Sequence, residues 1–206
     1  MVVRLAYLYA GLAVFGISVA LMVRARLGLD PFDVLHQAIA RRLGVQIGWV
    51  VIAVSGAVLL AWIPLRQRPG LGTVSNAVLV GLVVNEALIF IPAPQHLLLR
   101  AAMLAAAIIA NGFATACYIG ASLGPGPRDG LMTGLAARGH SIRLVRTAIE
   151  VSVLLAGIAL GGSAGIGTLA YALSIGPLVH FFLPRLSLAT RHQQPRRQEQ
   201  ETEDLT

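Results

Sequence analysis

The sequence predicts an all-α polytopic membrane protein with six transmembrane helices, arranged as two inverted three-helix repeats that each hold one short, interrupted or amphipathic half-helix. Three observations predict this fold: an apolar composition, six long apolar runs, and one stretch of chain that recurs 96 residues later. Of the 206 residues, 56% are hydrophobic and 12% are charged, and the mean hydropathy is +0.76. Soluble domains carry about 25% charged residues, so this composition excludes an ordinary soluble protein.

Six apolar runs are long enough to be spans, because about 20 helical residues cross the hydrocarbon core of a bilayer. The first run is too long for the apolar region of a signal peptide and ends in Arg24 and Arg26 without a cleavage site, so we expect it to be retained. We expect spans near residues 5–23, 47–65, 73–91, 98–120, 144–161 and 167–184.

These spans form one transmembrane domain over residues 1–184, and residues 185–206 follow it. The last segment is rich in Gln, Arg and Glu and lacks apolar periodicity, which predicts a disordered cytoplasmic tail. The single cysteine, Cys117, lies in an apolar run, so no intrachain disulfide can form and we expect a small packed or lipid-facing residue.

Two stretches, residues 31–42 and 127–138, are amphipathic but too short to cross. Each begins with a proline, which suits the first helical position, and Asp30 or Gly126 before it suits the cap.

The third helical position of each half-helix is an aspartate, Asp33 or Asp129, whose carboxylate can reach back toward free backbone N–H groups. Whether the half-helices are re-entrant or lie on the membrane surface stays open.

A recurring pattern indicates a duplication. "ARLGLDPFDVL" at residues 25–35 recurs as "ASLGPGPRDGL" at 121–131, and "GLGTVSNAVLVG" at 70–81 recurs as "GIGTLAYALSIG" at 165–176. Repeat 1 therefore covers about residues 1–93 and repeat 2 about residues 97–184.

Each copy contains three predicted spans, so the second copy must enter the membrane from the opposite side and the repeats are inverted. If the half-helix crossed the membrane, the count would be even and the repeats parallel.

Inverted repeats are typical of transporters, where interrupted helices bring free backbone groups to a site at the repeat interface. The interruptions here are the candidate substrate-binding residues Gly28, Asp30, Pro31, Asp33, Gly124, Gly126, Pro127, Arg128 and Asp129. The alternative is that these loops only turn the chain and cap a surface-lying helix. The GxGT turn recurs in both copies, and it also has a purely structural interpretation, in which Thr73 and Thr168 are N-caps of the helices that follow.

Charged residues inside spans are costly unless they are paired or hydrated. Arg146 and Glu150 lie four residues apart on one face of the fifth predicted span and can form an ion pair. That pair is either architectural or part of a substrate or proton pathway. We also expect Asn85 and Glu86 to be interfacial, and Asn111 to hydrogen-bond across helices.

No Ser/His/Asp, Cys/His or Walker-type arrangement is present, and the histidines lack metal-ligand spacing. The sequence therefore predicts no catalytic residue, no metal site and no cofactor, and we do not expect an enzyme.

Five stretches together resemble one bacterial family: "LGLDPFDVLHQAIARRLG", "WIPLRQRPGLGT", "GPGPRDGLMTGLAARG", "RTAIEVSVLLAG" and "GIGTLAYALSIGPL". They are similar to the YczE-like integral membrane proteins, often placed with the YyaS and YitT proteins, and the resemblance covers roughly residues 5–184. The resemblance implies a multi-pass inner-membrane protein. It assigns no binding or catalytic residue to this chain.

The formal net charge of +7 comes from 16 arginines and no lysine. With six spans, eleven arginines fall on the side of the termini and five on the other, so both termini should be cytoplasmic. The arginines lie beside apolar runs, which indicates topology signals rather than a nucleic-acid surface. We expect the lipid bilayer and a small-molecule substrate as partners, and a homodimer is one option for the assembly.

The duplicated three-span unit favours a small-solute transporter or permease. The alternative is a non-transporting accessory or regulatory membrane protein that acts on a partner, which the short length, few intramembrane polar groups and basic tail would suit.

Overall fold

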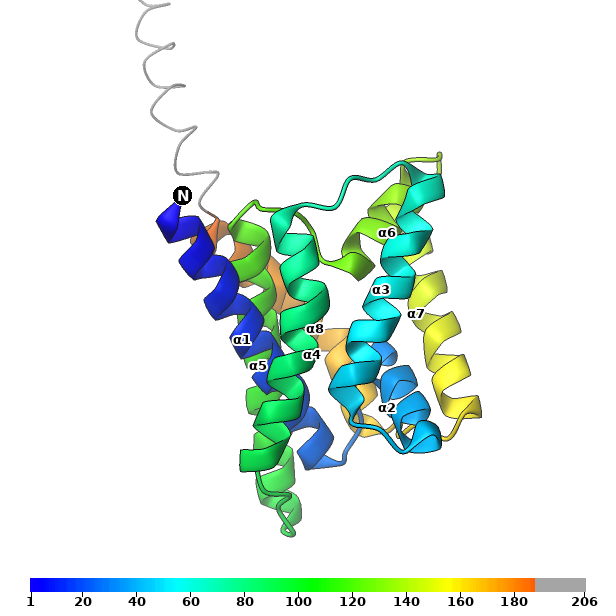
Figure 1. Cartoon of the computed structure of the whole chain (residues 1–206). Coiled ribbons are helices and arrows are strands. Elements are labelled where there is room, and N and C mark those ends of the chain that lie inside the picture. The colour runs from blue at the N-terminus through cyan, green and yellow to red at the C-terminus, as the bar shows by residue number, and fades with distance from the viewer. Residues whose placement is uncertain (188–206) are drawn as a thin grey trace, which may run out of the picture.

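The computed structural model describes residues 1–187, and the predicted tail lies outside these residues except for its first three. Within residues 1–187 the chain forms eight helices and no strand (Figure 1). The helices are α1 (Val2–Ala25), α2 (Pro31–Leu43), α3 (Ile47–Leu65), α4 (Leu71–Phe90), α5 (Leu97–Gly120), α6 (Pro127–Ala136), α7 (Ile142–Ala159) and α8 (Ile166–Leu186). The all-α prediction is confirmed for this part of the chain.

Five helices are long and apolar enough to cross a membrane: α1, α3, α4, α5 and α8. Their bounds lie within three residues of five predicted spans. The sixth predicted span, 144–161, folds as α7, which is less apolar because it carries Arg143, Arg146 and Glu150 within 18 residues. It is not among the five.

Helices α2 and α6 have 13 and 10 residues, too short to cross a bilayer at about 1.5 Å per residue. Figure 1 shows them at opposite ends of the bundle, with α6 at the end that bears the N-terminus. Helices α1 and α5 run antiparallel beside each other.

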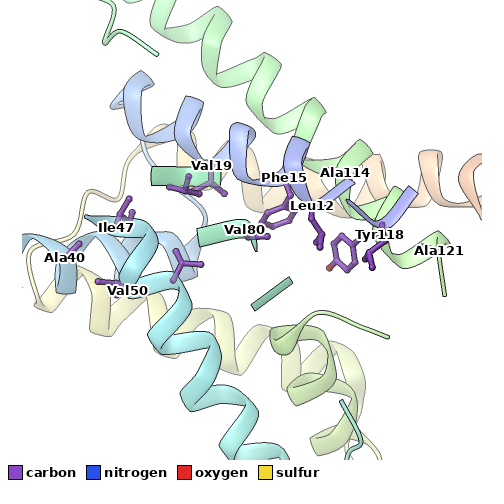
Figure 2. Packing of buried hydrophobic residues seen from close by; sticks show 13 residues of the cluster. Leu12, Phe15, Val19, Ala40, Ile47, Val50, Val80, Ala114, Tyr118 and Ala121 are labelled. Atoms are coloured by element: carbon purple, nitrogen blue, oxygen red, sulfur yellow. The ribbon is translucent and has the colours of Figure 1, made fainter. Parts of the chain in front are cut away.

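The other helices make matching contacts in the two halves. Helix α4 packs on α1 as α8 packs on α5, and α7 packs on α2 as α3 packs on α6. The larger apolar core lies where α1, α3, α4 and α5 meet (Figure 2). Its labelled members include Leu12, Phe15, Val19, Val50, Val80, Ala114 and Tyr118.

The loop of each half binds the start of a helix in the other half. The N–H of Gly167, in the first turn of α8, donates to the carbonyl of Leu27 at 2.8 Å. At the equivalent place, Gly72 N–H at the start of α4 donates to Leu123 carbonyl, also at 2.8 Å.

Gly28 and Gly124 permit this close contact. Both have positive φ, 128° and 119°, and a Cβ at either would lie 2.8 Å from the hydroxyl oxygen of Thr168 or Thr73. The interpretation of these threonines as N-caps is wrong. Each is the third residue of its helix, and its hydroxyl oxygen accepts the N–H of the glycine at the N-cap.

A third reciprocal contact joins the ends of the half-helices to α7 and α3. Arg42, in the last turn of α2, donates from Nε to the carbonyl of Leu160 at 3.0 Å. Arg138, just after α6, donates from its guanidinium to the carbonyl of Pro64 at 2.7 Å. Cations at helix C-termini are favourable because they face free carbonyl groups.

Two buried amides stabilise helix contacts. The predicted bond of Asn111 across helices is confirmed: its Nδ2 donates to the Ser18 hydroxyl at 2.8 Å, and Tyr171 donates to its Oδ1 at 3.0 Å. Asn85, which we expect near the membrane interface, also makes a contact between helices. Asn85 is 6% exposed, and its Oδ1 accepts the N–H of Gly48 at 2.8 Å, which caps the start of α3.

Candidate functional site

The two half-helices meet at their N-terminal ends. Asp30 caps α2, since its Oδ1 accepts the N–H groups of Phe32 at 2.6 Å and Asp33 at 3.1 Å. Gly126 at the corresponding cap of α6 has no side chain, so α6 lacks a side-chain cap. Both ends carry the partial positive charge of a helix N-terminus.

An ion pair joins the two ends. Arg128, the second residue of α6, places a guanidinium nitrogen 2.6 Å from Oδ2 of Asp30. The side chain of Asp30 is 2% exposed and that of Arg128 is 29% exposed. The guanidinium also lies over the rings of Phe32 and Phe15, 5.0 and 5.7 Å from their centroids. One cation therefore holds both half-helices and α1 together.

A cavity of about 160 Å³ lies on one side of this ion pair, and we call it the large cavity. It is bounded by α1, α2, α5, α6, α7 and α8, and the ends of α5 and α7 that line it are those nearest the N-terminus of the chain. Its polar lining consists of Asp30, Thr115, Tyr118, Arg128, Asp129, Arg146, Glu150 and Tyr171.

A cavity of about 30 Å³, the small cavity, lies between α1, α2, α3, α4 and α6. Phe15, Phe32 and Arg128 line both cavities, so these three side chains form the partition between them. The polar lining of the small cavity otherwise comes from Asp33, His36, Ser55 and Asn76.

Each cavity contains the aspartate at the third position of one half-helix. The sequence places these carboxylates near free N–H groups of their own helices, but their side-chain bonds go elsewhere. Asp129 Oδ2 accepts the hydroxyl of Tyr118 at 2.5 Å in the large cavity. Asp33 Oδ1 lies 3.0 Å from Nδ1 of His36 in the small cavity.

Arg146 and Glu150 line the large cavity from α7. Nε of Arg146 lies 2.9 Å from Oε1 of Glu150, and the two side chains are 50% and 30% exposed. The two charges are therefore not enclosed in a packed core, and an ion pair with this exposure contributes little to stability.

The predicted site residues divide into two groups. Asp30, Pro31, Arg128 and Asp129 line the large cavity, and Asp33 and Pro127 line the small one. The glycines take no part in the lining: Gly28 and Gly124 pack on α8 and α4, and Gly126 lies beside Asp129.

Sequence reasoning missed the aromatic half of the site. Phe15, Tyr118 and Tyr171 come from α1, α5 and α8 and sit in otherwise apolar runs, where rings are ordinary core residues. The two tyrosines could have been found from their polar groups, because a tyrosine inside a span needs a hydrogen-bond partner for its hydroxyl. His36, which pairs with Asp33, was missed because a single histidine on a half-helix has no spacing partner.

Comparisons with known proteins place the chain among bacterial membrane proteins. Residues 2–184 match a group described as a family of unknown function (DUF6198). An uncharacterized protein of Haemophilus influenzae is 43% identical over 84% of this chain and 79% of its own length. The uncharacterized membrane protein YczE of Bacillus subtilis is 29% identical over 90% of this chain and 87% of its own length.

The uncharacterized protein YyaS, also of Bacillus subtilis, is 27% identical over 86% of this chain and 92% of its own length. No solved structure matches the chain.

Proposed function

The chain belongs to the family of unknown function DUF6198, and from the geometry of its two cavities we propose that it is a small-solute transporter of the bacterial inner membrane. The predicted resemblance to the YczE and YyaS proteins is confirmed. One observation carries the proposal: the N-terminal ends of two half-helices meet in the Asp30–Arg128 ion pair, with a cavity on either side.

The proposal includes six spans in two inverted repeats, with α7 as the sixth span and the half-helices re-entrant. The matching contacts of the two halves support it. Leu27 and Leu123 accept equivalent backbone hydrogen bonds, and the equivalent helices α1 and α5 run antiparallel beside each other. Discontinuous helices whose N-termini face a central site are a recurring arrangement in transporters with inverted repeats.

The largest departure from the match is the contact between α3 and α4. Helix α3 packs closely on α4, whereas the equivalent α7 and α8 make no comparable contact. We assign α3–α4 as a closed gate and α7–α8 as an open one. In the other state α7 closes on α8 and α3 parts from α4, so that solute bound beside the partition becomes accessible from the opposite side.

For orientation we keep the proposal that both termini are cytoplasmic. Arg128 and Arg146 line the large cavity and should not count as loop charges. Removing these two from the eleven leaves nine arginines against five, so the side of the termini still carries the excess. The large cavity then opens toward the cytoplasm.

Reconstitution tests transport directly. We expect purified protein in liposomes to give saturable uptake of one class among labelled small cations, anions and neutral solutes. The double variant Asp30→Asn with Arg128→Met removes the charges of the partition together, so it should fold and lose the uptake. Uptake no greater than that of empty liposomes for all classes, with a stoichiometric partner co-purifying, would instead indicate an accessory protein.

A further inference from the structure

We propose that the solute bound in the large cavity is a small organic monocation, held by the carboxylate of Asp129 and the aromatic wall around it. This inference rests on the proposed site, although it concerns binding and does not require transport. Three observations carry it: the balance of charges around the partition, the unused acceptor positions of two carboxylates, and the size and lining of the cavity.

With all four carboxylates ionised, the charges of the two cavities taken together do not balance without a cation. Four carboxylates line the two cavities, against two guanidinium groups. The two half-helix N-termini add roughly half a positive charge each, so an excess of about one negative charge remains when His36 is neutral. An anionic solute would increase this excess, whereas a monocation removes it. The carboxylates are Asp30, Asp33, Asp129 and Glu150, and the guanidinium groups are those of Arg128 and Arg146.

Asp129 is the carboxylate of the large cavity that has no cationic partner. Asp30 pairs with Arg128 at 2.6 Å and Glu150 pairs with Arg146 at 2.9 Å. Within residues 1–187, the side chain of Asp129 receives only the hydroxyl of Tyr118. Its remaining acceptor positions are therefore available to a donor or a cation in the cavity.

Asp33, the equivalent carboxylate of the small cavity, also has a hydrogen-bond acceptor position without a donor. Asp33 is 4% exposed, and its Oδ2 is buried and meets no hydrogen-bond donor in the described chain. Buried acceptors without a partner are uncommon and costly. Each half-helix thus presents one carboxylate with a free acceptor to its own cavity, as a cation site used alternately by two halves would require.

Size and lining select an organic cation over a metal ion. An apolar cavity of about 150 Å³ accepts benzene, so the large cavity of about 160 Å³ suits a solute of roughly six heavy atoms. Tyr118 and Tyr171 line it, and aromatic faces attract ammonium groups. Phe15 and Phe32 also line it, and Arg128 already lies over one face of each ring. Among the described residues no group of three His, Cys, Asp or Glu could hold a metal ion.

Three solutes of similar branched shape test the proposal: tetramethylammonium, neutral tert-butanol and anionic pivalate. The readout is the shift in thermal unfolding of the purified full-length protein, because a ligand that binds the folded state raises its midpoint. We expect tetramethylammonium chloride to give the largest shift, above sodium chloride at equal ionic strength. An equal or larger shift with pivalate or tert-butanol, or none with tetramethylammonium, overturns the proposal.

Variants locate the site. Asp129→Asn should weaken tetramethylammonium binding at least about tenfold, whereas Asp129→Glu should keep the preference for the cation. Glu86→Gln, which removes an exposed carboxylate of α4 outside both cavities, is the matched control and should change nothing. Unchanged binding in Asp129→Asn contradicts the assignment. If that variant does not fold, the wild-type ranking of the three solutes still decides.

The outcomes separate binding from transport. Selective binding of tetramethylammonium without uptake into liposomes would refute the transporter proposal and leave the cation site intact. Saturable uptake of an anion, with no preference for tetramethylammonium, would support the transporter proposal and refute the cation site.

Discussion

The contacts α3–α4 and α7–α8 occupy equivalent places in the two halves of the chain, yet only the first is packed. In α3–α4, a Cβ added to Gly48 would overlap the carbonyl oxygen of Gly81. In α8, Gly176 corresponds to Gly81, and a Cβ added there would meet no atom within 4 Å. A glycine present in both copies can therefore serve a contact that only one copy makes.

The burial of the two helices follows the same difference. Helix α3 buries Ile47, Gly48, Val50, Val51 and Trp62, whereas Gly157 is the single buried residue of α7. Helix α7 packs mainly on the half-helices α2 and α6, so little apolar surface holds it against α8. Helix α8 also contains Pro177 directly after Gly176, and a proline inside a helix removes one backbone bond. We expect the α7–α8 gap to close with little rearrangement elsewhere.

The ion pair between the halves should give the largest single effect. Asp30→Asn keeps a side chain that can cap α2 but leaves Arg128 without its counter-charge. Because Asp30 is buried and Arg128 is partly exposed, we expect a loss of about 2–3 kcal/mol in the free energy of unfolding, below the range for a fully buried pair. Unfolding of the purified protein measures it.

Adding Arg128→Met to Asp30→Asn should recover much of that loss, since the uncompensated charge is then gone. A single variant as stable as the wild type would show that the partition between the two cavities does not depend on this pair.

The two glycines test the gates. Gly48→Ala should lower the free energy of unfolding by about 1–3 kcal/mol, because the new Cβ forces α3 away from α4. Gly176→Ala should leave it unchanged or raise it by up to about 1 kcal/mol, since alanine favours the helix and meets no neighbour. Thermal unfolding of both variants in the same detergent gives the comparison. Similar losses for the two substitutions would remove the distinction between a packed and an open gate.

The exposed ion pair of α7 should give the smallest effect. Arg146 and Glu150 are 50% and 30% exposed, so Glu150→Gln should cost no more than about 1 kcal/mol of stability. The effect should shrink further in high salt, which screens exposed pairs. A loss as large as that of Asp30→Asn would mean that α7 is packed against α8 in solution.

Much of this fold can be predicted from periodicity and local signals. Residues 47–65 form α3 at the predicted bounds, and Pro31 and Pro127 begin their half-helices as expected. These features depend on residues close together in sequence, where apolar length and cap chemistry decide the outcome.

The partners of the site residues could not be predicted in the same way. Asp33 and Asp129 turn from their own helix ends to His36 and Tyr118 because the fold places those groups within reach. Asn85 caps a helix 37 residues earlier in the chain, a contact that no local pattern records. The difference between the packed α3–α4 contact and the open α7–α8 contact could not be predicted either, because the repeated sequence predicts two equal halves.

Thiol labelling of one equivalent pair of positions tests whether the two cavities are accessible from opposite sides of the membrane. Val80 lines the small cavity and Ile175 occupies the corresponding place in the large one. Each is replaced by cysteine in a Cys117→Ala background and exposed, in sealed vesicles of known orientation, to a membrane-impermeant methanethiosulfonate. We expect Ile175→Cys to react from the side that bears the termini, and Val80→Cys to react more slowly and only from the opposite side. Reaction of both from the same side, or of Ile175→Cys alone under every condition, would show that the two cavities do not alternate.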